Sequence, residues 1–194
     1  MSLKVQQSLQ SGFSLIEVLV AVVVIAIGLL GNASIQALSL NNTSIARIRS
    51  LAALEADGLA SMMHANSVYW HSSVVPSGAS GFTITGNQGS NYSATTISDA
   101  TLNGQTNNCL SAACTSEQMA GYDLKQWGLS VANLIPAGVG KVQCSVVTGA
   151  PVSCVISISW TENNLALNKG SGTETGNLAS GTSVTQSYSL VVQP

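Results

Sequence analysis

Charged side chains are scarce in this chain of 194 residues. Lys and Arg together number 6, Asp and Glu number 8, and the formal net charge is −2. Because the basic residues are scattered, the sequence has no basic patch of the kind that binds nucleic acid, and no polybasic surface for anionic lipid. We therefore expect no nucleic-acid partner. The basic residues are Lys4, Arg47, Arg49, Lys125, Lys141 and Lys169.

Histidine and the common catalytic motifs are also scarce or missing from the sequence. Its two histidines, His64 and His71, have no partner at a metal-ligand spacing. No nucleophile elbow, His-Glu-x-x-His motif or P-loop occurs. We interpret the histidines as surface or capping residues, and we expect no enzymatic activity, no cofactor and no metal site.

Four cysteines are present, at Cys109, Cys114, Cys144 and Cys154. An even number beyond a membrane-targeting segment indicates disulfides formed in an oxidising compartment, and four cysteines allow three pairings. We expect Cys109–Cys114 and Cys144–Cys154, because each pair closes a short local loop. The alternative is a zinc site, but zinc ligand pairs usually lie two to four residues apart and the second pair is spaced far more widely.

Proline is absent from Phe13 to about Asn66, and no charge interrupts the apolar run from Val18 to Leu30. The first part is apolar on all sides, as a membrane span requires. A single helix of about 50 residues would be about 75 Å long, against a hydrocarbon core of about 30 Å. The second half must therefore lie outside the membrane, where a globular domain is expected to pack on its apolar stripe. The stripe consists of Leu38, Ile45, Ile48, Ala52, Leu59, Met62 and Met63.

One acid, Glu17, stands where the apolar run begins, five residues after Gly12. A charged carboxylate in a membrane helix costs at least about 2.5 kcal/mol, so it indicates a function. The segment Gly12-Phe13-Ser14-Leu15-Ile16-Glu17 resembles the class III signal of type IV prepilins. The resemblance implies that a prepilin peptidase cuts between Gly12 and Phe13, that Phe13 is N-methylated, and that Glu17 serves subunit assembly by pairing with a neighbour's Phe13 amine. The alternative is that Glu17 is an incidental polar residue at the start of a span.

Downstream patterns predict one short helix and several strands. A helix over 115–135 begins with capping-box spacing from Thr115 to Gln118 and carries an apolar stripe. Alternation predicts strands over 141–148, 152–160 and 183–193, which we expect to form a three-stranded antiparallel sheet. Two further strands, Gly81–Thr85 and Tyr92–Ile97, are expected around a turn. The stripe of the short helix is Ala120, Leu124, Trp127, Val131 and Leu134.

A second resemblance covers the region after the long helix. Its motifs are Cys109-x4-Cys114-Thr115, Tyr122-Asp123-Leu124-x-Gln126-Trp127, Leu134-Ile135-Pro136-x-Gly138-x-Gly140-x-Val142 and Ile156-Ser157-Ile158-Ser159-Trp160. Together they are similar to the PilV family of type IV pilus modification proteins, which are minor pilins. The resemblance implies a minor pilin that primes pilus assembly and joins a tip complex with other minor pilins, the major pilin and a PilY-type adhesin.

These resemblances imply an α+β, type IV pilin-like fold: a long N-terminal helix, half of it transmembrane, packed on a small antiparallel sheet with a second short helix. Residues 1–12 would be a removed leader, 13–40 the transmembrane and filament-core half of the helix, and 41–194 the periplasmic domain with the rest of the helix. We expect the protein in the bacterial inner membrane, crossing once, and later at the pilus tip.

Two alternative functions are open. The first is a minor pseudopilin of a type II secretion system, which shares the N-terminal signal. The second is a secreted ligand-binding domain whose ordinary signal peptide is cut beyond Leu30. Glu17 and the helical continuation to Asn66 argue against the second alternative.

Overall fold

The computed structural model describes residues 14–72, 75–76, 80–147, 149–164 and 182–194. The chain divides into two compact units, Met1–Asn42 and Thr43–Pro194. Helix α1 (Leu15–Ala65) begins in the first unit and ends in the second. The uninterrupted long helix predicted from the missing prolines is confirmed.

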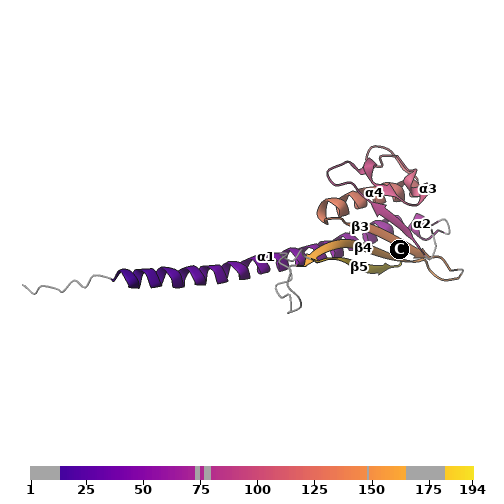
Figure 1. Ribbon diagram of the computed structural model, residues 1–194. Helices are drawn as coiled ribbons and strands as arrows, with labels where there is room; N and C mark the ends of the chain where they lie inside the picture. The colour runs from indigo at the N-terminus through magenta and orange to yellow at the C-terminus, as the bar shows by residue number, and fades with distance from the viewer. Residues whose placement is uncertain (1–13, 73–74, 77–79, 148, 165–181) are drawn as a thin grey trace, which may run out of the picture. The chain divides into compact units, whose positions relative to one another are not determined.

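The second unit contains all the remaining helices and strands of the described residues (Figure 1). Before the second long helix, α4, short helical segments alternate with short strands. In chain order, the elements after α1 are α2 (Ser67–Trp70), β1 (Phe82–Thr85), the 3₁₀ helix η1 (Tyr92–Ala94), β2 (Thr96–Ile97), α3 (Ala100–Asn103), α4 (Ser116–Leu134), β3 (Val139–Ser145), β4 (Ser153–Asn164) and β5 (Thr182–Val192).

The strands form one antiparallel sheet of five, in the order β2-β1-β3-β4-β5. The expectation of three strands was therefore wrong. The first strand predicted within 81–97 is confirmed as β1, but the second is a strand only at Thr96–Ile97, because Tyr92–Ala94 forms the 3₁₀ helix η1. β1 and β2 pair with each other and also join the sheet, since Phe82 of β1 lies opposite Val142 of β3. Phe82 and Ile84 are both buried, so β1 has an apolar face that a separate two-stranded hairpin would leave in water.

Helix α4 begins where its capping sequence predicts. The Thr115 hydroxyl accepts from the Gln118 backbone amide at 3.2 Å, and the Gln118 side chain accepts from the Thr115 amide at 3.0 Å. The predicted stripe is buried except for Leu134, which is 41% exposed. Ile135 takes its place in the core, because the backbone leaves helical geometry at Ile135 (φ −119°, ψ 112°).

The part of α1 in the second unit contributes a narrow buried stripe of Ala52, Ala56, Leu59 and Met63. Of the predicted stripe, Ala52, Leu59 and Met63 are buried, Ile45 and Ile48 are only partly buried, and Met62 is 36% exposed. Ala56 belongs to the stripe although it was not predicted, and the side chain of Leu38 lies outside the described residues. Helix α4 lies beside this part of α1, because the Trp127 indole Nε1 donates to the Glu55 carbonyl at 2.8 Å.

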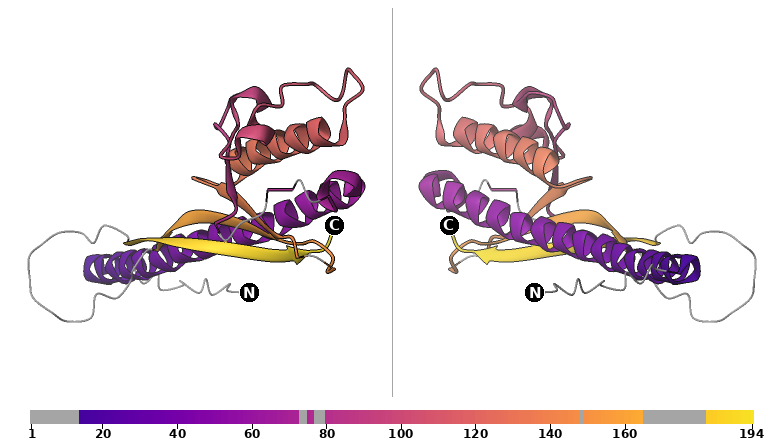
Figure 2. Two further views of the ribbon diagram at one scale, coloured as in Figure 1. Left: turned by 90° about the vertical axis from the view of Figure 1, so that its right-hand side faces the viewer. Right: turned by 90° about the vertical axis from the view of Figure 1, so that its left-hand side faces the viewer.

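Helix α4 and the part of α1 in the second unit cover the same face of the sheet (Figure 2). Trp127 of α4 packs on Gly140 of β3, where an added Cβ would come within 2.2 Å of the indole ring. Gly140 lies opposite Ile158 of β4, and Glu162, four residues further along β4, contacts Arg49 of α1. Residues an even number apart in a strand share a face, so Ile158 and Glu162 lie on the same face of β4. Helix α4 and the part of α1 in the second unit therefore pack on the same face of the sheet.

Candidate processing and assembly site

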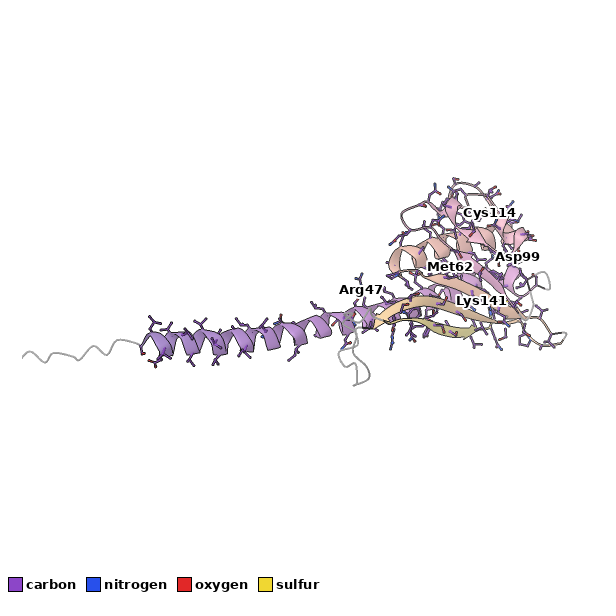
Figure 3. All side chains as sticks on the ribbon, in the orientation of Figure 1. Arg47, Met62, Asp99, Cys114 and Lys141 are labelled. Atoms are coloured by element: carbon purple, nitrogen blue, oxygen red, sulfur yellow. A yellow bond between two sulfur atoms is a disulfide. The ribbon has the colours of Figure 1, made fainter. Side chains whose placement is uncertain are left out.

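The first unit contains the one candidate membrane span among the described residues, Leu15–Ala33. It has 19 residues and a mean hydropathy of 2.5. Its large apolar side chains point outward all around the helix (Figure 3), with Leu15 82% exposed and Leu30 74% exposed. A surface of this kind is stable only in hydrocarbon or against other apolar helices.

Glu17 lies in the first turn of α1. The backbone amides of Glu17 and Val18 donate to the Ser14 carbonyl at 3.0 and 3.3 Å, so helical hydrogen bonding begins at Ser14. A carboxylate at this position is favoured by the helix dipole, an effect of about 0.3–1 kcal/mol at an exposed site. Gly12 and Phe13 lie outside the described residues, so the position of cleavage stays a prediction.

Gly28 and Gly31 interrupt the apolar surface of the span. A Cβ added at either glycine would meet no atom within 4 Å. Small residues on a membrane helix allow another helix backbone to approach closely. Over its described residues, 14–42, the first unit therefore offers one charged group, Glu17, at the start of the helix and a shallow apolar contact surface farther along.

The structure contains both disulfides that local spacing predicts. Cys144 of β3 lies directly opposite Cys154 of β4 with the two Cα atoms 4.0 Å apart, and both residues are buried. Cys109 and Cys114 are joined in a partly exposed loop that ends beside the Thr115 cap. Across the described ranges, no group of three or more His, Cys, Asp or Glu residues could hold a metal ion.

The Tyr122–Trp127 segment of α4 is built around contacts that fix this helix. Besides the hydrogen bond from Trp127 to α1, the side-chain amide of Gln126 donates to the Tyr122 hydroxyl at 2.9 Å. Ser130, one turn further, donates to the Glu55 carboxylate at 2.8 Å. The motif is therefore structural: it holds α4 against α1 and against the glycine of β3.

Lys125 is a buried cation that sequence reasoning treated as one of several scattered bases. It is 5% exposed, and its Nζ donates to the carbonyls of Asn103 and Gln105 at 2.8 and 2.7 Å. Burial lowers the pKa of Lys125. The sequence did contain a signal for this burial. Gly121 lies four residues before Lys125 and Gly128 three residues after it, so the three share one side of α4, and all three are buried.

Glu162 is a buried acid that sequence reasoning missed, because the predicted strand ended at Trp160. Arg49 Nε and Nη2 donate to its two carboxylate oxygens at 3.0 and 2.8 Å, and the Trp160 indole donates at 3.0 Å. The Glu162 side chain is 1% exposed, against 57% for Arg49. The hydrogen bonds from Arg49 outweigh burial and hold the pKa of Glu162 below its ordinary value. This pair ties β4 to α1.

Comparison with known proteins bears on the N-terminal part of the chain. Residues 7–31 match the family described as the prokaryotic N-terminal methylation motif. The match includes Gly12, Phe13, Glu17 and the apolar run. Neither a curated protein nor a solved structure matches the chain.

The motif and the layout together support one class of protein, a type IV pilin or pseudopilin. The chain carries the methylation signal of type IV pilins and pseudopilins, followed by an α+β arrangement of the pilin type. Proteins with this signal are generally structural subunits, processed by prepilin peptidase and assembled with other pilins. The signal and the apolar helix fit membrane anchoring and incorporation into a pilus.

Proposed function

We propose that this protein is a minor pilin of the PilV type, which primes type IV pilus assembly and forms part of the pilus tip complex. The observation that supports this most directly is the methylation signal in the same chain as an α+β unit. Within that unit, α4 carries the Tyr122–Trp127 motif. The proposed partners are other minor pilins, the major pilin and a PilY-type tip adhesin.

The proposed pathway begins in the bacterial inner membrane. Prepilin peptidase removes residues 1–12 and methylates the new amine of Phe13. Residues 13–40 then anchor the protein and later enter the filament core, while 41–194 form the periplasmic domain. The role is structural and needs no catalytic group.

Glu17 has a specific place in this pathway. Cleavage leaves a positive amine on Phe13, and packed helices would bring it near a neighbour's Glu17. An unpaired charge in an apolar bundle costs several kcal/mol, so pairing favours one register of the incoming subunit. In this proposal Glu17 is an assembly residue, and the anchoring energy comes from the apolar side chains after it.

Mass spectrometry of the mature N-terminus is the first test. The proposal expects N-methylated Phe13, whereas a secreted domain with an ordinary signal peptide would begin beyond Leu30. An unmodified or differently cut terminus would contradict the proposed processing.

Incorporation into pili is the second test, and Glu17→Ala is the informative variant. It removes a costly acid from the membrane helix, so insertion should be unimpaired. The ratio of protein in sheared pili to protein in the inner membrane should fall, because the neighbour's amine has lost its partner. Asp57→Ala, at an exposed acid of the same helix, is the matched control. Parental incorporation of Glu17→Ala would contradict the assembly role.

Pilins and pseudopilins both carry the methylation signal, so the signal does not distinguish them. The amounts of protein in sheared pili and in the inner membrane do. A minor pilin should be recovered with sheared pili at a small fraction of the major pilin, and its deletion should reduce the number of pili. Loss of type II secretion with normal piliation would identify a pseudopilin.

A further inference from the structure

Strand β5 forms one edge of the sheet and lacks the usual protection of an edge strand. It has eleven residues, Thr182–Val192, without charge or proline. Eleven consecutive pairs with β4, from Cys154↔Val192 to Asn164↔Thr182, leave no bulge. Natural edge strands are commonly short, charged, bulged or interrupted by proline, because an open edge pairs readily with another strand. The opposite edge, β2, has only two residues.

The register identifies which backbone groups of β5 point away from β4. Cys144 and Cys154 have Cα atoms 4.0 Å apart, a separation typical of a non-hydrogen-bonded pair. Cys154 therefore turns its amide and carbonyl toward β5, where Val192 is its partner. Every second residue of β5, counted from Val192, bonds to β4. The residues between them direct amides and carbonyls outward, namely Ser183, Thr185, Ser187, Ser189 and Val191.

This outward row has no partner in the described part of the chain. Among the described residues, none of the backbone hydrogen bonds outside the regular elements involves β5, and no side chain accepts a hydrogen bond from the five outward amides. The outer face of β4 and β5 is rich in hydroxyl groups: Ser189 pairs through its hydroxyl with Ser157 of β4, 2.9 Å apart, and Ser187 lies opposite Ser159. On this face the described residues of β4 and β5 carry no charge, and Lys141 lies one strand further away, on β3 opposite Ser157.

We propose that β5 binds an extended strand of a different protein of the tip complex, which becomes a sixth strand of the sheet. This inference rests on the proposed function. The edge itself specifies the chemistry of its partner, because alternating amides and carbonyls are matched by an extended peptide backbone. Backbone pairing gives the contact its strength, and side chains of the added strand lie over the hydroxyl-rich surface.

A second copy of this chain does not fit the edge. β5 runs in the same general direction as the part of α1 in the second unit (Figures 1 and 2). Antiparallel pairing of β5 with β5 of a copy would therefore reverse that helix in the copy. Subunits assembled from one membrane have their helices in the same direction. A copy in the same orientation would offer its β2 edge, which is two residues long.

Hydrogen exchange of the full-length protein tests the contact at the level of single amides. Three samples are compared: protein in detergent, native membranes from piliated cells, and sheared pili. The outward amides, such as Thr185 and Ser187, should exchange quickly in detergent and on the order of 100-fold more slowly when the added strand is present. The alternate amides that bond to β4 should be protected in all samples.

The outcomes separate this proposal from the proposed function. Outward amides that stay fast in both native samples, or are already slow in detergent, overturn strand addition. Absence of the processed protein from sheared pili contradicts the pilin function, and the membrane sample then decides strand addition alone.

Ser187→Pro provides a genetic test with Ser187→Val as its control. Proline removes an outward amide without breaking a bond to β4, so the melting temperature should match that of the valine variant. Formaldehyde crosslinking in cells should give a hetero-complex that falls about ten-fold in the proline variant only, the effect of losing about 1.4 kcal/mol. Equal complexes in both variants, or crosslinks between two differently tagged copies that depend on the Ser187 amide, would overturn the assignment.

Discussion

The two halves of α1 use the same backbone geometry in two different surroundings. Over 14–40, every residue whose side chain is described is exposed, and large apolar residues occur on all sides. From Thr43 on, the buried residues form a single stripe of small and medium size. A helix that is apolar all round needs an apolar environment all round, whereas a striped helix needs one packed neighbour. The distribution of apolar side chains, and not helix formation itself, distinguishes an anchor from a core element.

Residue type differs between the halves as well. The anchor half is rich in valine and isoleucine, as in Val22-Val23-Val24-Ile25, and such β-branched residues are weaker helix formers in water. In hydrocarbon every backbone group must be satisfied within the segment, so helix forms there despite the residue type. The second half uses alanine, leucine and methionine, which favour helix in water.

The largest expected effect is on the first unit alone. Gly12→Val should block prepilin peptidase, because a bulky residue replaces the glycine before the cut. Full-length precursor should accumulate in the inner membrane, as judged by intact mass. The second unit should keep both disulfides and its melting temperature. Mature protein of normal mass from this variant would exclude Gly12 as the cleavage determinant.

Trp127→Ala should have the largest effect on the second unit alone. The change removes a buried indole and leaves the Glu55 carbonyl without that donor, so the free energy of unfolding should fall by about 3–5 kcal/mol. Thermal unfolding of the processed protein measures it. Leu134→Ala, at a half-exposed position of the same helix, is the control and should cost about 1 kcal/mol or less. Similar losses in both variants would contradict the core position of Trp127.

The two disulfides should differ in accessibility more than in energy. Replacing Cys144 and Cys154 together by alanine should cost about 2–4 kcal/mol, and the Cys109–Cys114 loop somewhat less because it is shorter. Under mild reduction of the folded protein, the partly exposed pair should open first and the buried pair only on unfolding. Peptide mapping after timed alkylation checks the order, and crossed pairs would contradict the β3–β4 register.

Glu162→Gln should lower the stability of the fold by an amount that depends on pH. The pKa of Glu162 is lowered in the folded state, so the carboxylate stabilises the fold above the unfolded-state pKa of about 4.5. That contribution is lost as the pH falls through the lower folded-state pKa. The variant should melt about 3–6 °C below the parent at pH 7, with the gap closing under more acidic conditions. A gap independent of pH would show that the ion pair is not its cause.

Asp123→Asn should give the smallest change in stability, and this change should be an increase. Burial raises the pKa of Asp123 to about 6, so its charged form opposes folding above that pH. The penalty disappears as the pH falls from about 6 to the unfolded-state value of 3.8. The variant should melt about 1–3 °C above the parent at pH 7, a modest gain because the carboxyl is only half-buried, and the two should converge near pH 4. Destabilisation by asparagine would contradict this assignment.

The sequence by itself determined the features that depend on near neighbours in the chain. Apolar residues on every side of a proline-free segment specify the anchor helix, and Thr115 with Gln118 specifies the start of α4. The Cys144–Cys154 pair follows from two alternating strands joined by a short turn. The motif Gly12-Phe13 with Glu17 indicates processing, because a lone acid at that spacing is costly without a use.

Only the tertiary structure decided the features that join distant segments. The extension of the sheet by β1 depends on Phe82 meeting Val142, and the burial of Glu162 depends on Arg49, 113 residues earlier. Alternation within a strand specifies which residues share a face, but not which other strand lies beside it. Likewise, a charged residue is buried only where another element supplies its partners, as Asn103 and Gln105 do for Lys125. Local periodicity contains no information about such partners, because they come from elsewhere in the chain.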